Sequence, residues 1–293
     1  MQTNKTIITS SIWYEQADEQ SEFQPKSISC MGYDIVNQIL PNATWIEYLF
    51  LLISGKRAEP QEKLLLEKLS LILCNPGLRD FGVRAAMNAG VGKAPASSIL
   101  ISGISCSAGQ FYGSQEVSLC MQWMKASVKL SDAESSDGKT SDFEPLSFIN
   151  ALKKLDKKEV LPDIKHPPGF DIHFEKTSPF VLECLQFLTK AVSSSYLNGL
   201  EEHRETIEST AGYPISLICV LAAGFCDLGL TEEQCEYLFL ILRLPGIAAH
   251  ALEQKELGWK KFPFFADTVK FTQEEKPTKL PDISQLVKHY VND

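Results

Sequence analysis

The feature that most constrains the fold is a continuous apolar stretch in the last third of the chain. Residues 214–227, PISLICVLAAGFCD, are apolar on nearly every side of a helix. A helix that is apolar all round is buried, so other elements have to pack around it. Its length is well below the roughly 20 apolar residues that a membrane span needs. We therefore predict a buried central helix with Gly229 just beyond its end.

Other segments carry helical patterns. Residues 45–54 are densely apolar and end at Gly55, and Pro60 opens a leucine-rich stretch, so a helical hairpin is expected here. Residues 85–105 are rich in small side chains without strand-like alternation, which favours one or two buried, tightly packed helices. Strand signals are weak, and residues 7–13 are the best candidate for a short strand. The fold class is mainly α.

Two helix starts are marked by capping residues. Ser178 and Pro179 form an N-cap and first-turn pair, and Thr231 begins a capping box with Gln234, from which we predict a helix to about Leu242. The polar segment 131–141 reads as an excursion between helices. The helix after Pro179 places these residues on one face: Phe180, Val181, Cys184, Phe187, Leu188 and Ala191.

Composition excludes several classes of protein. The 293 residues carry a net charge of −9 and show no dense Lys/Arg stripe, so we expect no nucleic-acid partner. The polar N-terminus and the lack of a long apolar run predict a cytoplasmic protein with no membrane contact. Eight cysteines form no C-x-x-C pair and mostly sit in apolar stretches, which predicts reduced buried thiols and no metal site.

Several segments, in order along the chain, resemble the citrate synthase family. The most specific is RLPGIAAHALEQ at residues 243–254, close to the family's R-x-P-G-x-x-A-H-x-x-E-Q signature. PGF at residues 168–170 stands where the family reads P-G-F-G-H, and SPF at residues 178–180 where it reads D-P-R. GYDI at residues 32–35 matches an opening motif, and the short length resembles the stand-alone citryl-CoA lyases.

The resemblance covers about residues 28–265. It implies a citrate synthase-like helical fold, in which a large helical domain carries a smaller helical subdomain. We expect an N-terminal extension (1–30), the first part of the large domain with a flexible loop at 131–143 (31–167), the smaller subdomain with the central helix (168–230), a return to the large domain (231–265) and a C-terminal tail (266–293).

The family's chemistry uses a carboxylate base that deprotonates an acyl-CoA methyl group and histidines that polarise two carbonyl groups; the lyases run these steps toward cleavage. Such groups need a pKa near the working pH and donors aimed at the developing enolate oxygen. By the resemblance, the base falls at Ile218, and no acidic residue lies between Glu208 and Asp227. One histidine position is Pro76. The resemblance thus implies that catalytic groups have been replaced.

Two residues remain as catalytic candidates. His173 follows Ile172, which occupies the position of the P-G-F-G-H histidine. Tyr112 occupies the position of a synthase histidine that the lyase branch also lacks, and its hydroxyl can donate a hydrogen bond. A surface role for His173 and a packing role for Tyr112 stay open as alternatives.

The positions that bind substrate carboxylates are also changed. Arg243 stays in register with the family, although an arginine that pairs with an Asp or Glu is the alternative. Lys261 falls near a late arginine position and supplies only a point charge. Phe180 and Met31 stand at two other arginine positions, so citrate or oxaloacetate would meet apolar walls. We assign His250, inside the signature, to the scaffold.

Three functions stay open. The first is a pseudoenzyme that keeps the fold and binds a ligand. The second is an enzyme of altered specificity that acts on another acyl-CoA or oxo-compound through Tyr112, His173, Asp171 or Glu175. The third is a non-catalytic partner of an active paralogue. CoA or an acyl-CoA is the candidate ligand, with no covalently bound cofactor and no cofactor residue assigned, and a homodimer through residues 85–105 is the expected assembly.

Overall fold

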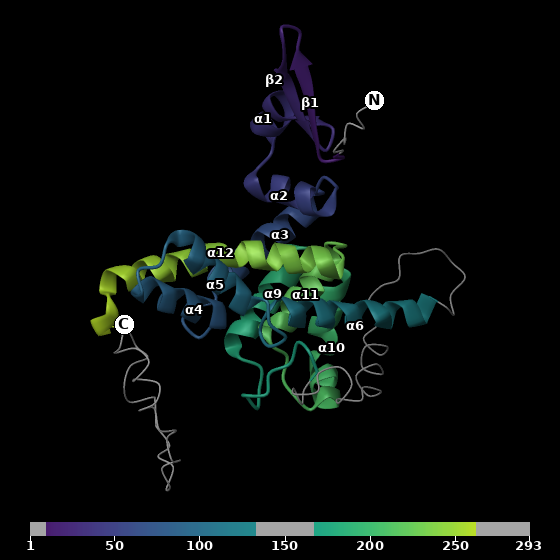
Figure 1. The fold of residues 1–293 in the computed structure, drawn as a ribbon. Coiled ribbons are helices and arrows are strands. Elements are labelled where there is room, and N and C mark those ends of the chain that lie inside the picture. Colours follow the sequence, from purple (N-terminus) through teal and green to yellow (C-terminus); the bar gives the residue numbers. More distant parts are fainter. Residues whose placement is uncertain (1–9, 133–166, 262–293) are drawn as a thin grey trace, which may run out of the picture.

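The computed structural model describes residues 10–132 and 167–261 of the chain. In these ranges it is mainly helical, as expected (Figure 1). The helices gather into one body, and a small β-hairpin projects from it at the N-terminal end, beyond α1 and α2 (Figure 1). The division into domains that we derived from the sequence stays a prediction.

The N-terminal hairpin was not foreseen. We expected a strand at residues 7–13, but the first strand, β1 (Trp13–Asp18), begins where that range ends. It pairs antiparallel with β2 (Ser21–Cys30), and β3 (Tyr33–Asp34) adds a short third strand. Most side chains of β1 are exposed, so the sequence lacks the apolar alternation that marks a strand with one buried face. Residues 7–9 lie outside the described ranges.

The helical body follows a short π-helical turn. That turn, η1 (Ile35–Ile39), leads into α1 (Leu40–Asn42). The remaining helices are α2 (Trp45–Ser54), α3 (Pro60–Leu73), α4 (Phe81–Val91), α5 (Ala96–Ser107), α6 (Ser114–Asp132), α9 (Pro179–Ala191), α10 (Ser195–Ala211), α11 (Leu217–Asp227) and α12 (Glu232–Leu257), followed by a 3-10 turn, η2 (Trp259–Lys261).

The predicted central helix is confirmed. Helix α11 is buried at every position from Ile218 to Cys226 and contacts α3, α6, α9 and α10. It begins at Leu217 rather than Pro214, because the residues before it form a β-bridge, Phe170 with Ile215. The α2–α3 hairpin, the two helices of residues 85–105 and the Thr231 capping box are also confirmed. Beyond Asp132, the predicted loop lies outside the described ranges.

The buried face of α9 differs from the expected one. Phe180 and Phe187 are exposed, at 57% and 55%, whereas Leu185 is buried. Ser178 caps the helix as predicted, since its hydroxyl accepts a hydrogen bond from the Val181 amide at 3.3 Å. The face toward the core is therefore rotated by about one residue, and it comprises Val181, Cys184, Leu185 and Leu188.

The expected end of the last helix at Leu242 is wrong. Helix α12 continues through Pro245 to Leu257. Gly246 turns its amide away from the helix and donates a hydrogen bond of 2.7 Å to the Cys74 carbonyl at the end of α3. Pro245 has no amide to satisfy, so the interruption leaves no donor unpaired. By length and composition α12 could cross a membrane, but it packs against α4, α5 and α6 as a core helix does.

Candidate functional site

A cavity of about 430 Å³ lies among the N-terminal ends of α4, α9 and α11, the loop before α6, residues 171–176 and α12. Its volume is in the range of small-molecule sites. Most of its wall is apolar, and a few charged groups converge on it. The lining residues are Pro76, Arg79, Asp80, Phe81, Phe111, Tyr112, Asp171, His173, Phe174, Lys176, Ser178, Val181, Ile215, Ser216, Leu217, Ile218 and Arg243.

Three of the four predicted site residues meet here: Tyr112, His173 and Arg243. Lys261 does not line the cavity; it is exposed on η2, after the end of α12. Asp171 lines the cavity, while Glu175 lines a neighbouring one.

The cavity wall also contains Pro76 and Ile218, the positions of a family histidine and of the family base. Met31 and Phe180 stand at two positions where the family has an arginine, and neither lines the cavity. The replaced positions are therefore not all gathered around this cavity, contrary to what the sequence had suggested. Met31 instead follows β2 in the N-terminal hairpin.

Arg243 is bound to an acidic residue. Its Nη1 lies 3.2 Å from Oδ2 of Asp80, and both side chains are almost fully buried. Asp80 also caps α4, because its Oδ1 accepts a 2.9 Å hydrogen bond from the Val83 amide. Burial lowers the pKa of Arg243, and Asp80 opposes that shift. The guanidinium charge is therefore largely balanced within the protein.

Tyr112 is held in a strained conformation. Its φ of +55° lies in the left-handed region, which a bulky side chain rarely adopts. The buried carboxylate of Glu116 accepts hydrogen bonds from the amides of Tyr112 and Gly169, at 2.5 and 2.9 Å. One carboxylate thus ties together the two loops that carry Tyr112 and Asp171. Burial raises the pKa of Glu116 to about 7, against the effect of these two bonds.

The Asp171 carboxylate interacts with the Tyr112 hydroxyl. Burial is the main cause that raises the pKa of Tyr112, and the nearby charge of Asp171 raises this pKa further. Asp171 also accepts a 2.8 Å hydrogen bond from the backbone amide of His173. The His173 ring packs edge-on against Phe111 at 5.9 Å. The cavity therefore contains a hydroxyl–carboxylate pair beside an imidazole, a set that can move protons.

Ser216 precedes the central helix at the cavity wall. It is the N-cap residue of α11, but its hydroxyl makes no capping bond. Both the Ser216 hydroxyl and Nε of Arg243 are buried without a hydrogen-bond partner among the residues that the structure describes. Buried polar atoms are normally paired. Both atoms are shielded from solvent, although other atoms of the two residues line the cavity.

Sequence reasoning missed Asp80, Glu116 and Ser216. Asp80 precedes the apolar start of a helix, and Ser216 precedes the central helix, so an N-cap pattern was available for both. Glu116 gave no signal, because nothing in its sequence neighbourhood distinguishes a buried carboxylate from a solvated one.

The part of the α12 signature that follows Arg243 serves packing rather than chemistry. A side chain at Gly246 would meet the Cys74 carbonyl oxygen at 2.4 Å. Ile247 fills the space left by Gly103 on α5. His250 Nε2 lies 2.9 Å from Oδ1 of Asn75, in the loop between α3 and α4, which supports its scaffold role.

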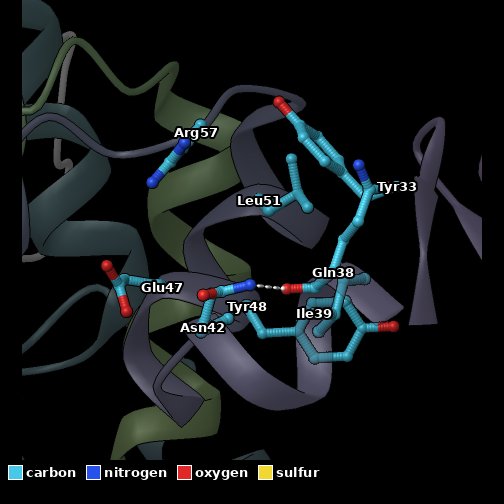
Figure 2. A pocket seen from close by; sticks show the side chains of 9 residues that line it. Tyr33, Gln38, Ile39, Asn42, Glu47, Tyr48, Leu51 and Arg57 are labelled. Atoms are coloured by element: carbon cyan, nitrogen blue, oxygen red, sulfur yellow. Dashed lines mark hydrogen bonds between the residues drawn. The ribbon is translucent and has the colours of Figure 1, made fainter. Parts of the chain in front are cut away.

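A second cavity, of about 340 Å³, lies near the N-terminal hairpin. Figure 2 shows Tyr33, Leu51 and Tyr48 around it, with Arg57 toward one side. None of the four predicted site residues, Tyr112, His173, Arg243 and Lys261, lines this second cavity. Of its polar groups, Glu47 binds Lys63 at 3.1 Å and the cap residue Thr44, so this carboxylate has a structural partner. We therefore place the candidate site in the first cavity.

No protein-family model and no curated protein sequence matches the chain. Solved structures do. The citryl-CoA lyase from Hydrogenobacter thermophilus superposes with a TM-score of 0.68 at 17% identity, over 97% of this chain and 100% of that one. An ATP citrate lyase from Methanothrix soehngenii, solved with citrate and coenzyme A, gives 0.68 at 18% identity, over 94% of this chain and 42% of its own length.

Citrate synthase from Thermotoga maritima superposes with a TM-score of 0.54 at 15% identity, over 80% of this chain and 59% of that one. At such low identity the agreement concerns the fold. The order of the helices and the coverage of a whole citryl-CoA lyase agree with the resemblance found in the sequence. The chain has the fold of the citrate synthase and citryl-CoA lyase family.

Proposed function

We propose that this protein is a citrate synthase- and citryl-CoA lyase-like protein that binds CoA or an acyl-CoA and does not carry out citrate chemistry. The similar fold of an ATP citrate lyase solved with coenzyme A supports CoA as the ligand. The cavity described above supplies the space for an acyl group.

One observation carries the proposal. The cavity wall has Pro76 and Ile218 where the resemblance places a histidine and the base, and neither side chain can accept or donate a proton. Arg243, the arginine in register, has its charge balanced by Asp80 at 3.2 Å. A bound citrate would have to compete with that buried pair for the guanidinium. The walls therefore favour a ligand with less charge than citrate.

Isothermal titration calorimetry tests this proposal. We expect saturable binding of CoA or acetyl-CoA to the purified protein and no heat from citrate or oxaloacetate at the same concentrations. Ile218→Asp restores a carboxylate at the base position, and Lys63→Ala, outside the cavity, is the control for surface changes. Absence of CoA binding, or citrate binding tighter than CoA binding, would contradict the proposal.

A second candidate function is favoured by the interaction of Tyr112 with Asp171 in the cavity. These two residues with His173 supply an acid–base set for an enzyme of altered specificity, acting on another acyl-CoA or oxo-compound. Screening acyl-CoA thioesters for release of free thiol tests it. Turnover that is lost in both Tyr112→Phe and Asp171→Asn, while both variants remain folded, would support this candidate over the first.

We also propose a homodimer, with an active paralogue as the alternative partner. Ile101 on α5 is 64% exposed although it is a large apolar residue, and α5 packs along α4 and α12 at one end of the body (Figure 1). The small side chains of residues 85–105 also let a helix of a second subunit approach closely, as such a contact needs.

A further inference from the structure

We infer that Glu116 is a pH-sensitive clamp on the wall of the cavity. Its ionised carboxylate holds the loop of Tyr112 against the loop of Gly169, and its protonation releases the Tyr112 loop. The inference concerns the regulation of the cavity, and it rests on the proposed ligand-binding role only for what the release does to a ligand. It is argued from the hydrogen bonds of Glu116, the other contacts of the two loops and the strain at Tyr112.

The two oxygens of the Glu116 carboxylate serve different loops. Oε2 accepts a hydrogen bond from the Tyr112 amide at 2.5 Å, and Oε1 accepts one from the Gly169 amide at 2.9 Å. The side chain is 1% exposed, so solvent water has little access to replace it as the acceptor. A protonated carboxyl group is neutral, and one of its oxygens carries a hydrogen and becomes a donor. Protonation therefore weakens both bonds, and most of all the bond to the oxygen that takes the proton.

The Gly169 loop is also held by contacts that do not involve Glu116. The Gly169 carbonyl accepts a 2.9 Å hydrogen bond from the Ser216 amide, and Phe170 forms a β-bridge with Ile215. A side chain at Gly169 would meet Cys120 Sγ of α6 at 2.7 Å, so this loop lies directly against that helix. We therefore expect the Gly169 loop to stay in place when Glu116 is protonated.

The Tyr112 loop is the one that is strained. The φ of Tyr112 is +55°, a value that a bulky residue keeps only where its surroundings enforce it. The preceding residue, Phe111, also lines the cavity, and its ring centroid lies 4.4 Å from that of Tyr112. A weaker bond from the Tyr112 amide lets this backbone relax, and both rings then shift together. The release therefore changes the aromatic part of the cavity wall, and a ligand that contacts it loses that contact.

The two states of Glu116 exchange near neutral pH. Burial raises the pKa of Glu116 to about 7, the two amide bonds act against this shift, and the charge of Asp171 adds to it. The Tyr112 hydroxyl and the Cys120 thiol are the other titratable groups on which the charge of Glu116 acts. The His173 ring packs against Phe111 at 5.9 Å, so it needs a control of its own. The clamp is therefore closed above about pH 7, where Glu116 is ionised, and open below it.

A pH titration of the wild-type protein by amide proton–nitrogen NMR tests the inference without any ligand. The signals to follow are the amides of Tyr112 and Gly169. Both amide protons should move upfield as the pH falls, with one shared midpoint near pH 7, because a neutral carboxyl group is the weaker acceptor. Below the midpoint the Tyr112 signal should also broaden from motion on the microsecond to millisecond timescale, while the Gly169 signal stays sharp.

Three variants assign the titration to its group. Glu116→Gln should abolish the shift of both amides, whereas His173→Gln should leave it in place. Glu183→Gln, which removes an exposed carboxylate on α9, is the matched control and should also leave it in place. Two wild-type amides that do not shift, or a shift that is lost in His173→Gln, would overturn the inference even if Glu116→Gln fails to fold. Because no ligand is present, the clamp can fail while CoA binding stands, and CoA binding can fail while the clamp stands.

Discussion

At the scale of single residues, Glu116 does the most to shape the candidate site. Its side chain is 1% exposed, yet it accepts hydrogen bonds from the amides of Tyr112 and Gly169, both at positive φ. These two bonds hold the loop before α6 against the loop before α9. The Tyr112 hydroxyl and the Asp171 carboxylate, which interact, are thereby kept on the wall of one cavity.

The raised pKa of Glu116 gives a prediction for stability. Burial moves it from 4.5 to about 7, so between these values the folded protein binds a proton that the unfolded chain releases. The free energy of unfolding should therefore fall as the pH rises from about 4.5 to 7 and level off above, by about 3 kcal/mol as an order of magnitude. Urea unfolding across this range measures it.

Glu116→Gln is the variant that isolates this effect. Glutamine does not titrate, so the difference in unfolding free energy between wild type and variant should change with pH in that window. Its amide oxygen can still accept one of the two backbone bonds, although its NH₂ group faces the other amide donor. A difference that stays constant from pH 5 to pH 8 would show that Glu116 has an ordinary pKa in the folded protein.

At this scale the sequence predicted part of the site. Tyr112, His173 and Arg243 were identified through their positions in family motifs, and all three line the cavity. Lys261 lies on η2 and does not line this cavity, so its substrate-binding role stays a prediction. The N-cap role of Asp80 had a local signal, but its pairing with Arg243 and the burial of Glu116 depend on contacts between residues distant in the sequence, which no local pattern encodes.

At the scale of elements, the close approach of α12 to α3, α4 and α5 is the main feature of the packing. Gly246 lets α12 touch the end of α3, while Gly90 and Gly103 let α4 and α5 approach Ala251 and Ile247. The small residues of 85–105, which suggested a subunit contact, thus also serve packing within the chain. The starts of three helices were predictable from Thr231, Ser178 and Pro60. The continuation of α12 past Pro245 was not, because it depends on a tertiary hydrogen bond to the Cys74 carbonyl.

Gly246→Ala tests this contact. A methyl group at this position would lie 2.4 Å from the Cys74 carbonyl oxygen, and backbone has to move to relieve that clash. We expect a loss of about 3 kcal/mol in unfolding free energy, measured by urea or thermal denaturation. Gly92→Ala is the matched control, since its φ is −70° and its nearest contact would be an ordinary 3.5 Å. Equal stability of the two variants would contradict the account.

At the scale of the whole molecule, a helical body encloses the buried α11, and the N-terminal hairpin stands apart from it (Figure 1). Apolar periodicity predicted the body well, because its helices bury one face each. The hairpin escaped prediction since its side chains are largely exposed, including Phe23 at 94%.

The proposed homodimer belongs to this scale. Ile101→Glu places a charge on the exposed face of α5 and should convert the dimer to a monomer in analytical ultracentrifugation. Leu71→Glu, at an equally exposed apolar position on α3, should leave the dimer intact. A monomeric wild type, or dissociation by both variants alike, would argue against an α5 interface.

Incubation of the purified protein with citryl-CoA, followed by chromatographic detection of acetyl-CoA, tests the central claim most directly. With Pro76 and Ile218 in the wall of the cavity, the account predicts no acetyl-CoA above the level in buffer alone. Acetyl-CoA formation that is lost in Arg243→Ala would contradict it and would show that other residues of this cavity carry out citrate chemistry.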